Sequence, residues 1–485
     1  MLPSSILQMA EGGFGCTDSE TDRVHRHSSL YSRHSRNYVE SVSVEISTIM
    51  TRLGYGEEMR KWRVKKYKDL DKLSIGRQKE ETIITAGSKA EGLTSYLESD
   101  HDMLHLQNFI LCVETGISLH TIPEDMDVFR MDTRVYPGHC ILLLERLVHF
   151  TMKIITAPLC DNGYGEFLFS SSLFLDECSA SLSFDRRLHV VQHKRAGPST
   201  PHTINEKQHT DTVHALRCLC PSVLQRWAAR PRQWPLPVIV QKVVSLGAYV
   251  TPTGFKDSVN KHIEWRICFN SGETELINNL NDTQAKVYVI LKMILKYILK
   301  PKNKEITSYI LKNIVLWQAE RNPQTRFSAY SLLLWLHDGL RELRTAIAKK
   351  YMPYYMIPER NLMEACGITN TLHRKWVADI TDMLEEGPRV ILRLEKIRKA
   401  IVASPEPMLW YSKTRMELEM LLLENRTRFK PRTDDNGDEL IEEPTFVENA
   451  IILRLIEVWE DMRERMLLEG SSVNDCRDIF DAMLM

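Results

Sequence analysis

The segment that most constrains this chain joins a small-residue turn to two closely spaced acids. Gly87-Ser88 is followed by Asp100 and Asp102, which stand at the start of a predicted apolar strand. Successive strand side chains point to opposite faces, so both carboxylates project to the same side. Two such carboxylates repel each other unless a cation lies between them. The simplest explanation is a hard divalent cation bound through oxygens, as in metal-assisted phosphoryl chemistry.

A site for two metal ions requires a third acid from a neighbouring strand. Asp211 is the best candidate because it heads another short predicted strand, and Glu98 is its rival because it shares the predicted face of the first two acids. The third acid also suits the role of general base on an attacking hydroxyl. Since Gly87 has no side chain, its turn can approach a phosphate, and the Ser88 hydroxyl can hold a phosphate oxygen. The combination predicts a nucleotidyltransferase.

Composition narrows the class of protein without identifying a partner. The 485 residues carry 63 Lys and Arg against 64 Asp and Glu, so net charge alone indicates no polyanionic ligand. The 10 cysteines are scattered without a CxxC pair, which is typical of a reducing compartment. We see no basic segment followed by a long apolar core near the N-terminus and no apolar run of membrane-spanning length. A cytoplasmic protein without membrane contact is expected.

The hydrophobic pattern predicts an α+β fold, with a mixed sheet lobe packed on a helical lobe. Apolar residues at helical spacing from Val42 to Glu81 predict one long spine helix, or two helices separated near Gly54. The expected domains are a flexible tail at 1–40, a core with the spine helix at 41–273, a helical lobe at 274–370 and a C-terminal helical extension at 371–485. Candidate strands are 102–106, 109–113, 140–144, 238–244, 248–251 and 264–269. Candidate helices are 307–320, 328–349, 372–402, 407–428 and 445–468.

Six basic residues lie close together in the middle of the spine helix: Arg60, Lys61, Arg63, Lys65, Lys66 and Lys68. Such a cluster usually forms a solvated helix face. Because this one precedes a candidate phosphate site, a nucleic-acid contact is the competing interpretation.

Six motifs in order along the chain resemble one family of animal nucleotidyltransferases. They are Gly87-Ser-Lys-Ala-Glu-Gly92, Asp100-His-Asp102-Met, Asp211-x-x-x-Ala-Leu, Trp265-Arg-Ile-Cys-Phe, Ser308-Tyr-Ile-Leu-Lys312 and Tyr355-Met-Ile-Pro-Glu-Arg-Asn-Leu362. The family contains cyclic GMP-AMP synthase, the cGAS-like receptors and the Mab developmental proteins. The resemblance runs from about Val42 to Leu362 and implies the nucleotidyltransferase fold.

The resemblance also implies roles for single residues. Asp100, Asp102 and Asp211 would bind Mg²⁺ (or Mn²⁺), with ATP and GTP as substrates. The remaining implied contacts to nucleotides are Gly87 and Ser88 at the phosphates, Arg266 and Glu273 facing the nucleotides, Lys292 at phosphate or ribose, and Ser308 and Tyr309 against a base. Lys292, Lys296 and Lys300 recur every four residues and would form one cationic helix stripe, which is otherwise an ordinary exposed face.

The chain departs from the DNA-sensing synthase of that family, which carries a zinc-binding His and Cys cluster. No Cys or His lies between Phe269 and Lys292. We therefore expect no zinc, and double-stranded RNA rather than DNA as the activating ligand. The spacing of His209, His214, Cys218 and Cys220 fits no common zinc finger. The acidic segment 434–438 lacks the Gly and Glu positions of a calcium loop.

Three functions stay open from the sequence. The first is a nucleic-acid-activated enzyme that makes a cyclic dinucleotide messenger in innate immune sensing, with a homodimer on its ligand as one arrangement. The second is a non-catalytic Mab-type interaction protein with the same fold. The third is an enzyme that extends an RNA 3′ end with the same catalytic parts.

Overall fold

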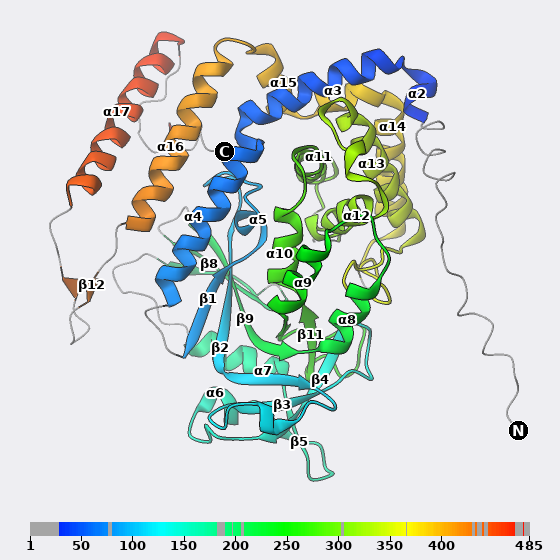
Figure 1. Ribbon diagram of the computed structural model, residues 1–485, viewed down its shortest axis with the longest axis vertical. Helices are drawn as coiled ribbons and strands as arrows, with labels where there is room; N and C mark the ends of the chain where they lie inside the picture. Colours follow the sequence, from blue (N-terminus) through cyan, green and yellow to red (C-terminus); the bar gives the residue numbers. More distant parts are fainter. Residues whose placement is uncertain are drawn as a thin grey trace, which may run out of the picture.

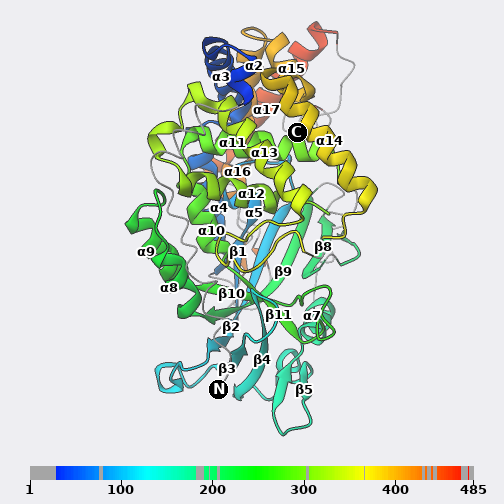
Figure 2. The same cartoon turned by 90° about the vertical axis from the view of Figure 1, so that its right-hand side faces the viewer.

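The computed structural model describes residues 29–75, 80–181, 190–195, 197–204, 208–301, 305–364, 366–428, 432–433, 439–440, 445–470 and 479. Figure 1 shows the strands gathered in the lower part of the molecule and most helices in the upper part. Turned by 90°, the same division is visible in Figure 2, with the helices above the sheet. The expected α+β class, with a sheet lobe and a helical lobe, is confirmed.

The spine consists of two helices, α3 (Arg36–Met50) and α4 (Glu57–Ile75), preceded by α2 (Ser29–Arg33). A π-helical turn, Thr51–Tyr55, separates them, and within it Gly54 has a φ of 81°. Because only glycine adopts this conformation readily, the chain can change direction there. Of the two sequence interpretations, the pair of helices separated near Gly54 is therefore correct. The expected tail boundary at residue 40 is wrong, since α3 begins at Arg36.

The sheet is built around the long strand β2 (His101–Glu114) and its parallel partner β9 (Gln208–Leu219). The other strands are β1 (Glu81–Thr85), β3 (Asp127–Asp132), β4 (His139–Arg146), β5 (Leu159–Asp161), β6 (Phe167–Phe169), β7 (Val190–Gln192), β8 (Ser199–Ile204), β10 (Ala248–Thr251) and β11 (Glu264–Cys268). Their order is β1-β2-β3-β4-β11-β10-β9-β8-β7, and the extra β2–β9 pairing makes the path return on itself. This closure brings residues from two distant parts of the chain side by side.

Two strand predictions need correction. The segments 102–106 and 109–113 belong to the single strand β2. The segment 238–244 is not a strand but part of the helix α9 (Pro237–Leu246). Pro237 stands at the start of that helix and Gly247 follows its last residue, both ordinary boundary signals of a helix that outweigh the β-branched composition.

The helical lobe centres on α11 (Asp282–Ile294), α12 (Ser308–Arg321) and α13 (Leu332–Lys349). Asn281 and Gln284 form a reciprocal capping box at the start of α11. The remaining helices of the two lobes are α5 (Gly87–Ala90), α6 (Lys153–Thr156), α7 (Ser171–Ser181), α8 (Pro221–Ala229), α10 (Asn270–Asn278), α14 (Asn370–Glu386) and α15 (Glu395–Val402). The predicted helix 372–402 is thus two helices, interrupted at Gly387 and Pro388.

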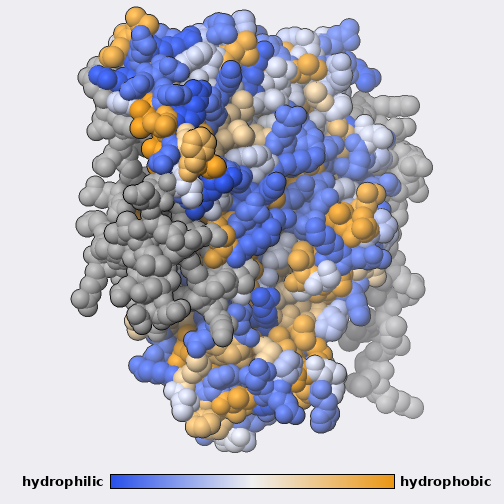
Figure 3. Space-filling view, turned by 60° about the vertical axis from the view of Figure 1, so that its left-hand side comes forward, coloured by the Kyte–Doolittle hydropathy of each residue, from blue (hydrophilic) through white to orange (hydrophobic). Residues whose placement is uncertain are grey.

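The C-terminal extension adds α16 (Met408–Arg428), the short pair β12 (Arg432–Thr433) and β13 (Glu439–Leu440), and α17 (Phe446–Leu468). Figure 1 shows α16 beside α4 and α17 beside α16. On the side where these helices come forward, hydrophobic residues form separate patches among hydrophilic ones (Figure 3). The acidic segment 434–438 lies outside the described residues. Across the described ranges, none of the helices combines the length and apolar character needed to cross a membrane.

Candidate active site

The Gly87-Ser88 turn follows β1 directly and lies against the carboxylate of Asp102. Gly87 has a φ of +61°, and a Cβ at this position would lie 2.0 Å from Oδ2 of Asp102. The backbone N–H of Ala86 also donates to the carbonyl of Asp102 at 2.8 Å. A side chain at position 87 would therefore displace the acid, which explains the glycine.

Two of the predicted acids, Asp102 and Asp211, come from strands that lie more than a hundred residues apart in the sequence. In the β2–β9 register Asp102 lies directly opposite Asp211. Asp100 immediately precedes β2 and is exposed. Burial raises the pKa of Asp102 to about 7, with further upward contributions from Asp211, Asp100 and Glu91. The fold therefore concentrates negative charge around one partly buried carboxyl.

The donor set fits a hard divalent cation. Its oxygens are carboxylates, the ligands that Mg²⁺ and Mn²⁺ prefer, and the missing Cβ of Gly87 lets the Asp102 carboxylate keep its position. A bound cation would relieve the repulsion that, together with burial, raises the pKa of Asp102. The oxygen atoms of the three carboxylates do not all lie within 4.8 Å of one another.

Glu98, the rival third acid, belongs to a different network. Its carboxylate accepts hydrogen bonds from the Tyr55 hydroxyl, from the Ser95 N–H at 3.0 Å and from Nζ of Lys396 at 3.0 Å. Burial alone would raise the pKa of Glu98, but Lys396, Tyr55 and the Ser95 N–H outweigh it and lower the pKa to about 2. Glu98 connects the spine to α15, and the register favours Asp211 as the partner of Asp102.

Lys292 reaches the turn from α11. Its Nζ donates to the Ser88 hydroxyl at 2.5 Å. Burial lowers the pKa of Lys292, although Glu91, Glu98 and Asp102 oppose the shift. Lys296 is exposed, and its Nζ donates to the carbonyl of Glu98 at 3.3 Å. Lys300 is exposed in a left-handed conformation after the helical segment. The predicted stripe is therefore not one uniform cationic surface.

Glu273 and Tyr309 meet in a buried polar network. One Glu273 oxygen accepts from the hydroxyls of Tyr309 and Tyr354, both at 2.6 Å. Nζ of Lys312 lies 3.5 Å from the other Glu273 oxygen and 2.5 Å from a Glu91 oxygen. Ser308, the first residue of α12, is half-buried beside this network. Glu273 thus has protein partners on both oxygens.

Arg266 and Tyr309 line one cavity of about 300 Å³. Its wall includes Tyr136 and Phe255, whose rings stack with centroids 3.8 Å apart. Arg360 supplies another cationic side chain. A planar aromatic wall with guanidinium groups is suited to a nucleotide base or phosphate.

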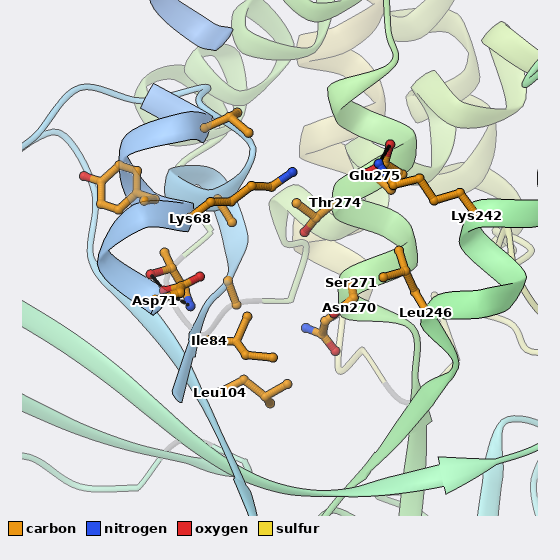
Figure 4. A pocket seen from close by; sticks show the side chains of 15 residues that line it. Lys68, Asp71, Ile84, Leu104, Lys242, Leu246, Asn270, Ser271, Thr274 and Glu275 are labelled. Atoms are coloured by element: carbon orange, nitrogen blue, oxygen red, sulfur yellow. Dashed lines mark hydrogen bonds and ion pairs between the residues drawn. The ribbon is translucent and has the colours of Figure 1, made fainter. Parts of the chain in front are cut away.

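A second cavity, of about 210 Å³, separates the spine from α9 and α10. Figure 4 shows Lys68, Asp71 and Ile84 on one side and Lys242, Thr274 and Glu275 on the other. Nζ of Lys242 pairs with Glu275 at 2.7 Å. Each wall carries one positive and one negative side chain, Lys68 with Asp71 and Lys242 with Glu275. This cavity therefore does not select for an anion.

The predicted basic cluster divides into buried and exposed members. Arg63 is 1% exposed and makes a bidentate ion pair with Glu419 of α16, at 2.8 and 2.7 Å. Arg60 is 2% exposed and donates to the carbonyl of Leu280 at 2.7 Å. These two arginines cannot belong to an exposed nucleic-acid surface, so that part of the prediction is wrong.

The four lysines lie nearer to solvent. Lys61, Lys65 and Lys68 are exposed, and Lys66 is half-buried in an ion pair with Glu424. Lys61 pairs with Glu57 one turn earlier at 2.5 Å. The helical period of 3.6 thus places the lysines and the arginines on different sides of α4.

Sequence reasoning missed Glu91, Lys312, Tyr354 and Lys396 as members of these networks. Glu91 and Lys312 are buried charged residues that lie inside the first and the fifth of the six motifs. Their place in those motifs was the available signal. Lys396 gave none, because its partner Glu98 lies 298 positions away.

Comparison with known proteins gives two partial matches. Residues 283–380, from α11 into α14, match the family described as Mab-21 protein HhH/H2TH-like domain. The chain is also 29% identical over 113 residues to a cyclic GMP-AMP synthase-like receptor of Ctenocephalides felis. That alignment covers 22% of this chain and 25% of the relative, so the chain matches about a quarter of the relative's length.

Proposed function

Since the chain is a member of the family of Mab-21 proteins and cyclic GMP-AMP synthase-like receptors, we propose that it is a metal-dependent nucleotidyltransferase. The observation that carries the proposal is the register of β2 and β9, in which Asp102 faces Asp211 beneath the Gly87 turn. The proposed product is a cyclic dinucleotide made from ATP and GTP.

In the proposed reaction a ribose hydroxyl oxygen of one nucleotide forms a bond to the α-phosphorus of another, and diphosphate leaves. Asp211 accepts the proton of the attacking hydroxyl, and Asp100 and Asp102 complete the set of metal ligands. Mg²⁺ or Mn²⁺, when bound, would activate the hydroxyl and neutralise the leaving oxygen. Lys292 and Ser88, which already contact each other, hold the phosphates.

The cavity at Arg266 and Tyr309 is the proposed place for a base. Glu273 acts there as a positioning residue, because it holds the Tyr309 hydroxyl at 2.6 Å. Ser308 and Tyr309 are the first two residues of α12, so the helix fixes the position of both backbones.

Double-stranded RNA is the proposed activator, bound along Lys61, Lys65, Lys66 and Lys68. Support comes from the exposure of Lys61, Lys65 and Lys68 on α4 and from the absence of Cys and His between Phe269 and Lys292. Their position just before the Gly87 turn gives a route by which binding could affect the acids. Cytoplasmic location and a role in innate immune sensing belong to the same proposal.

A non-catalytic interaction protein is the second candidate, favoured by two observations. The Ser88 hydroxyl is already bonded to Lys292, and the three carboxylates are not in a compact cluster. In this case the fold would bind partners without turnover.

The test is incubation with ATP, GTP and Mg²⁺ or Mn²⁺, with double-stranded RNA or DNA added separately. We expect a phosphatase-resistant product with RNA that Asp102→Ala abolishes. A linear product that extends an RNA 3′ end would assign the third alternative. No product with either nucleic acid, from protein that binds Mn²⁺, would favour the interaction protein.

A further inference from the structure

The strands that carry the acids carry a second cluster on their opposite face. In the β2–β9 register Asp102 lies opposite Asp211, and His105 lies opposite His214. Each histidine follows its aspartate by three positions, so both point to the other side of the sheet. Glu81, the first residue of β1, lies opposite Gln107 and so shares the histidine face. Three strands therefore converge on one point.

The three side chains are within reach of a single ion. Nδ1 of His105 lies 3.0 Å from one Glu81 oxygen, and Nδ1 of His214 lies 3.7 Å from the other. The two imidazole centroids are 5.3 Å apart. One ligand atom from each residue lies within 4.8 Å of the others, and in the described ranges no other set of three His, Cys, Asp or Glu residues meets this condition.

Three of the four imidazole nitrogens in this cluster lack hydrogen-bond partners. His214 is 5% exposed, and neither of its ring nitrogens has a partner among the described residues. Nε2 of His105 is also buried without one. Leaving a buried polar atom unpaired destabilises the folded chain. Burial, with His105 nearby, lowers the pKa of His214 to about 4, so the ring is neutral and has a free lone pair.

We propose that Glu81, His105 and His214 bind a divalent transition-metal ion of the zinc class. One carboxylate and two imidazoles form a common Zn²⁺ donor set, whereas Mg²⁺ prefers oxygens alone. Bonds of about 2.0–2.1 Å in a tetrahedral site place ligand atoms about 3.4 Å apart. The distances of 3.0 and 3.7 Å in the structure lie on either side of that value.

No zinc is expected from the sequence, because its Cys and His residues do not occur at finger spacing. This site does not follow such spacing, since its ligands come from three separate strands. Gln107 supports the carboxylate, because its Nε2 donates to Glu81 at 3.0 Å. Such outer hydrogen bonds orient ligands in metal sites.

The ion would act on the acids only through the backbone. It would join β1, β2 and β9 and fix the register of β2 and β9 three residues from Asp102 and Asp211. Its role is therefore structural, and the histidines are positioning residues rather than groups that touch substrate.

Zinc titration of the metal-stripped full chain, with millimolar Mg²⁺ present throughout, tests the proposal. We expect one tight Zn²⁺ per chain, a Co²⁺ form with the visible absorption of a tetrahedral site, and a higher melting temperature with Zn²⁺. Glu81→Gln keeps the shape and is expected to weaken Zn²⁺ binding by at least about 100-fold, since even outer partners are worth about 10–100-fold. His105→Gln is the second variant.

The control variants separate this site from others. His202→Gln changes a buried histidine of β8 outside the cluster, and Asp102→Asn changes the acid face; both are expected to bind Zn²⁺ like the unchanged chain. Near-ultraviolet circular dichroism checks that each variant is folded. The proposal is overturned if the unchanged chain binds no Zn²⁺, or if folded Glu81→Gln and His105→Gln bind it equally well. Loss of Zn²⁺ with Asp102→Asn alone would also overturn it.

Discussion

Two stretches of this chain carry like charges close together in the sequence, one at the start of β2 and one in α4. The fold arranges their side chains differently. Asp102 is placed opposite another acid, Asp211, by the pairing of β2 and β9, and Asp100 immediately precedes β2. The basic residues of α4 are instead divided, with Arg60 and Arg63 buried and the lysines nearer to solvent. A strand with period two keeps alternate residues together, whereas a helix with period 3.6 distributes neighbours around its axis. The period of the secondary structure therefore decides whether like charges that are close in the sequence remain together in the fold.

The largest effect is expected from removing the buried ion pair between α4 and α16. Arg63→Met leaves Glu419 buried without its ion pair, and we expect a loss of about 3–5 kcal/mol in the free energy of unfolding. Lys65→Met, on the exposed side, is expected to change it by no more than about 0.5 kcal/mol. Urea denaturation of both variants measures the difference. Equal, small losses would mean that the two sides of α4 do not differ as described.

The next effect tests the crowding at the acid cluster. Gly87→Ala places a Cβ 2.0 Å from Oδ2 of Asp102 and should displace the carboxylate. Because an error of about 1 Å can cost about 100-fold, we expect product formation to fall by roughly that factor.

Gly116→Ala is the matched control for this prediction. Gly116 also has a positive φ, of +96°, but a Cβ there would have nothing within 4 Å. Backbone strain is thus common to both variants, and only Gly87→Ala should lose activity. Similar losses in the two would show that strain, not contact with Asp102, is responsible.

The smallest effect concerns the exposed lysines. Lys65→Glu with Lys68→Glu should weaken binding of double-stranded RNA by about tenfold and lower the slope of log affinity against log salt by roughly two. Lys153→Glu with Lys261→Glu, at exposed lysines of α6 and of the loop before β11, is the charge-matched control. Fluorescence anisotropy at several salt concentrations measures both quantities. An unchanged slope in the double variant would remove α4 from the proposed RNA surface.

What the sequence could predict was local or came from ordered motifs. The break near Gly54 and the strands at 248–251 and 264–269 follow from short-range patterns that the structure retains. Asp211 was chosen because it heads an apolar run, and the register places it opposite Asp102 although it lies within β9.

What the sequence could not predict depends on partners far along the chain. Arg63 could be recognised as buried only once Glu419, 356 positions later, was placed beside it. The cluster of Glu81, His105 and His214 arises from strand pairing, and Glu98 was excluded by Lys396. The strand prediction for 238–244 was wrong because the β-branched residues there suit a strand by composition, while Pro237 and Gly247 set the limits of a helix.

The most direct test of the central claim is the release of diphosphate from ATP and GTP with Mg²⁺ or Mn²⁺ and double-stranded RNA. Diphosphate is released whatever linkage the nucleotidyltransferase makes. We predict steady release by the unchanged chain and a fall of at least about 1,000-fold in folded Asp211→Asn. Equal release by the two proteins, or none by the unchanged chain, would contradict the assignment of Asp102 and Asp211 as the reactive centre.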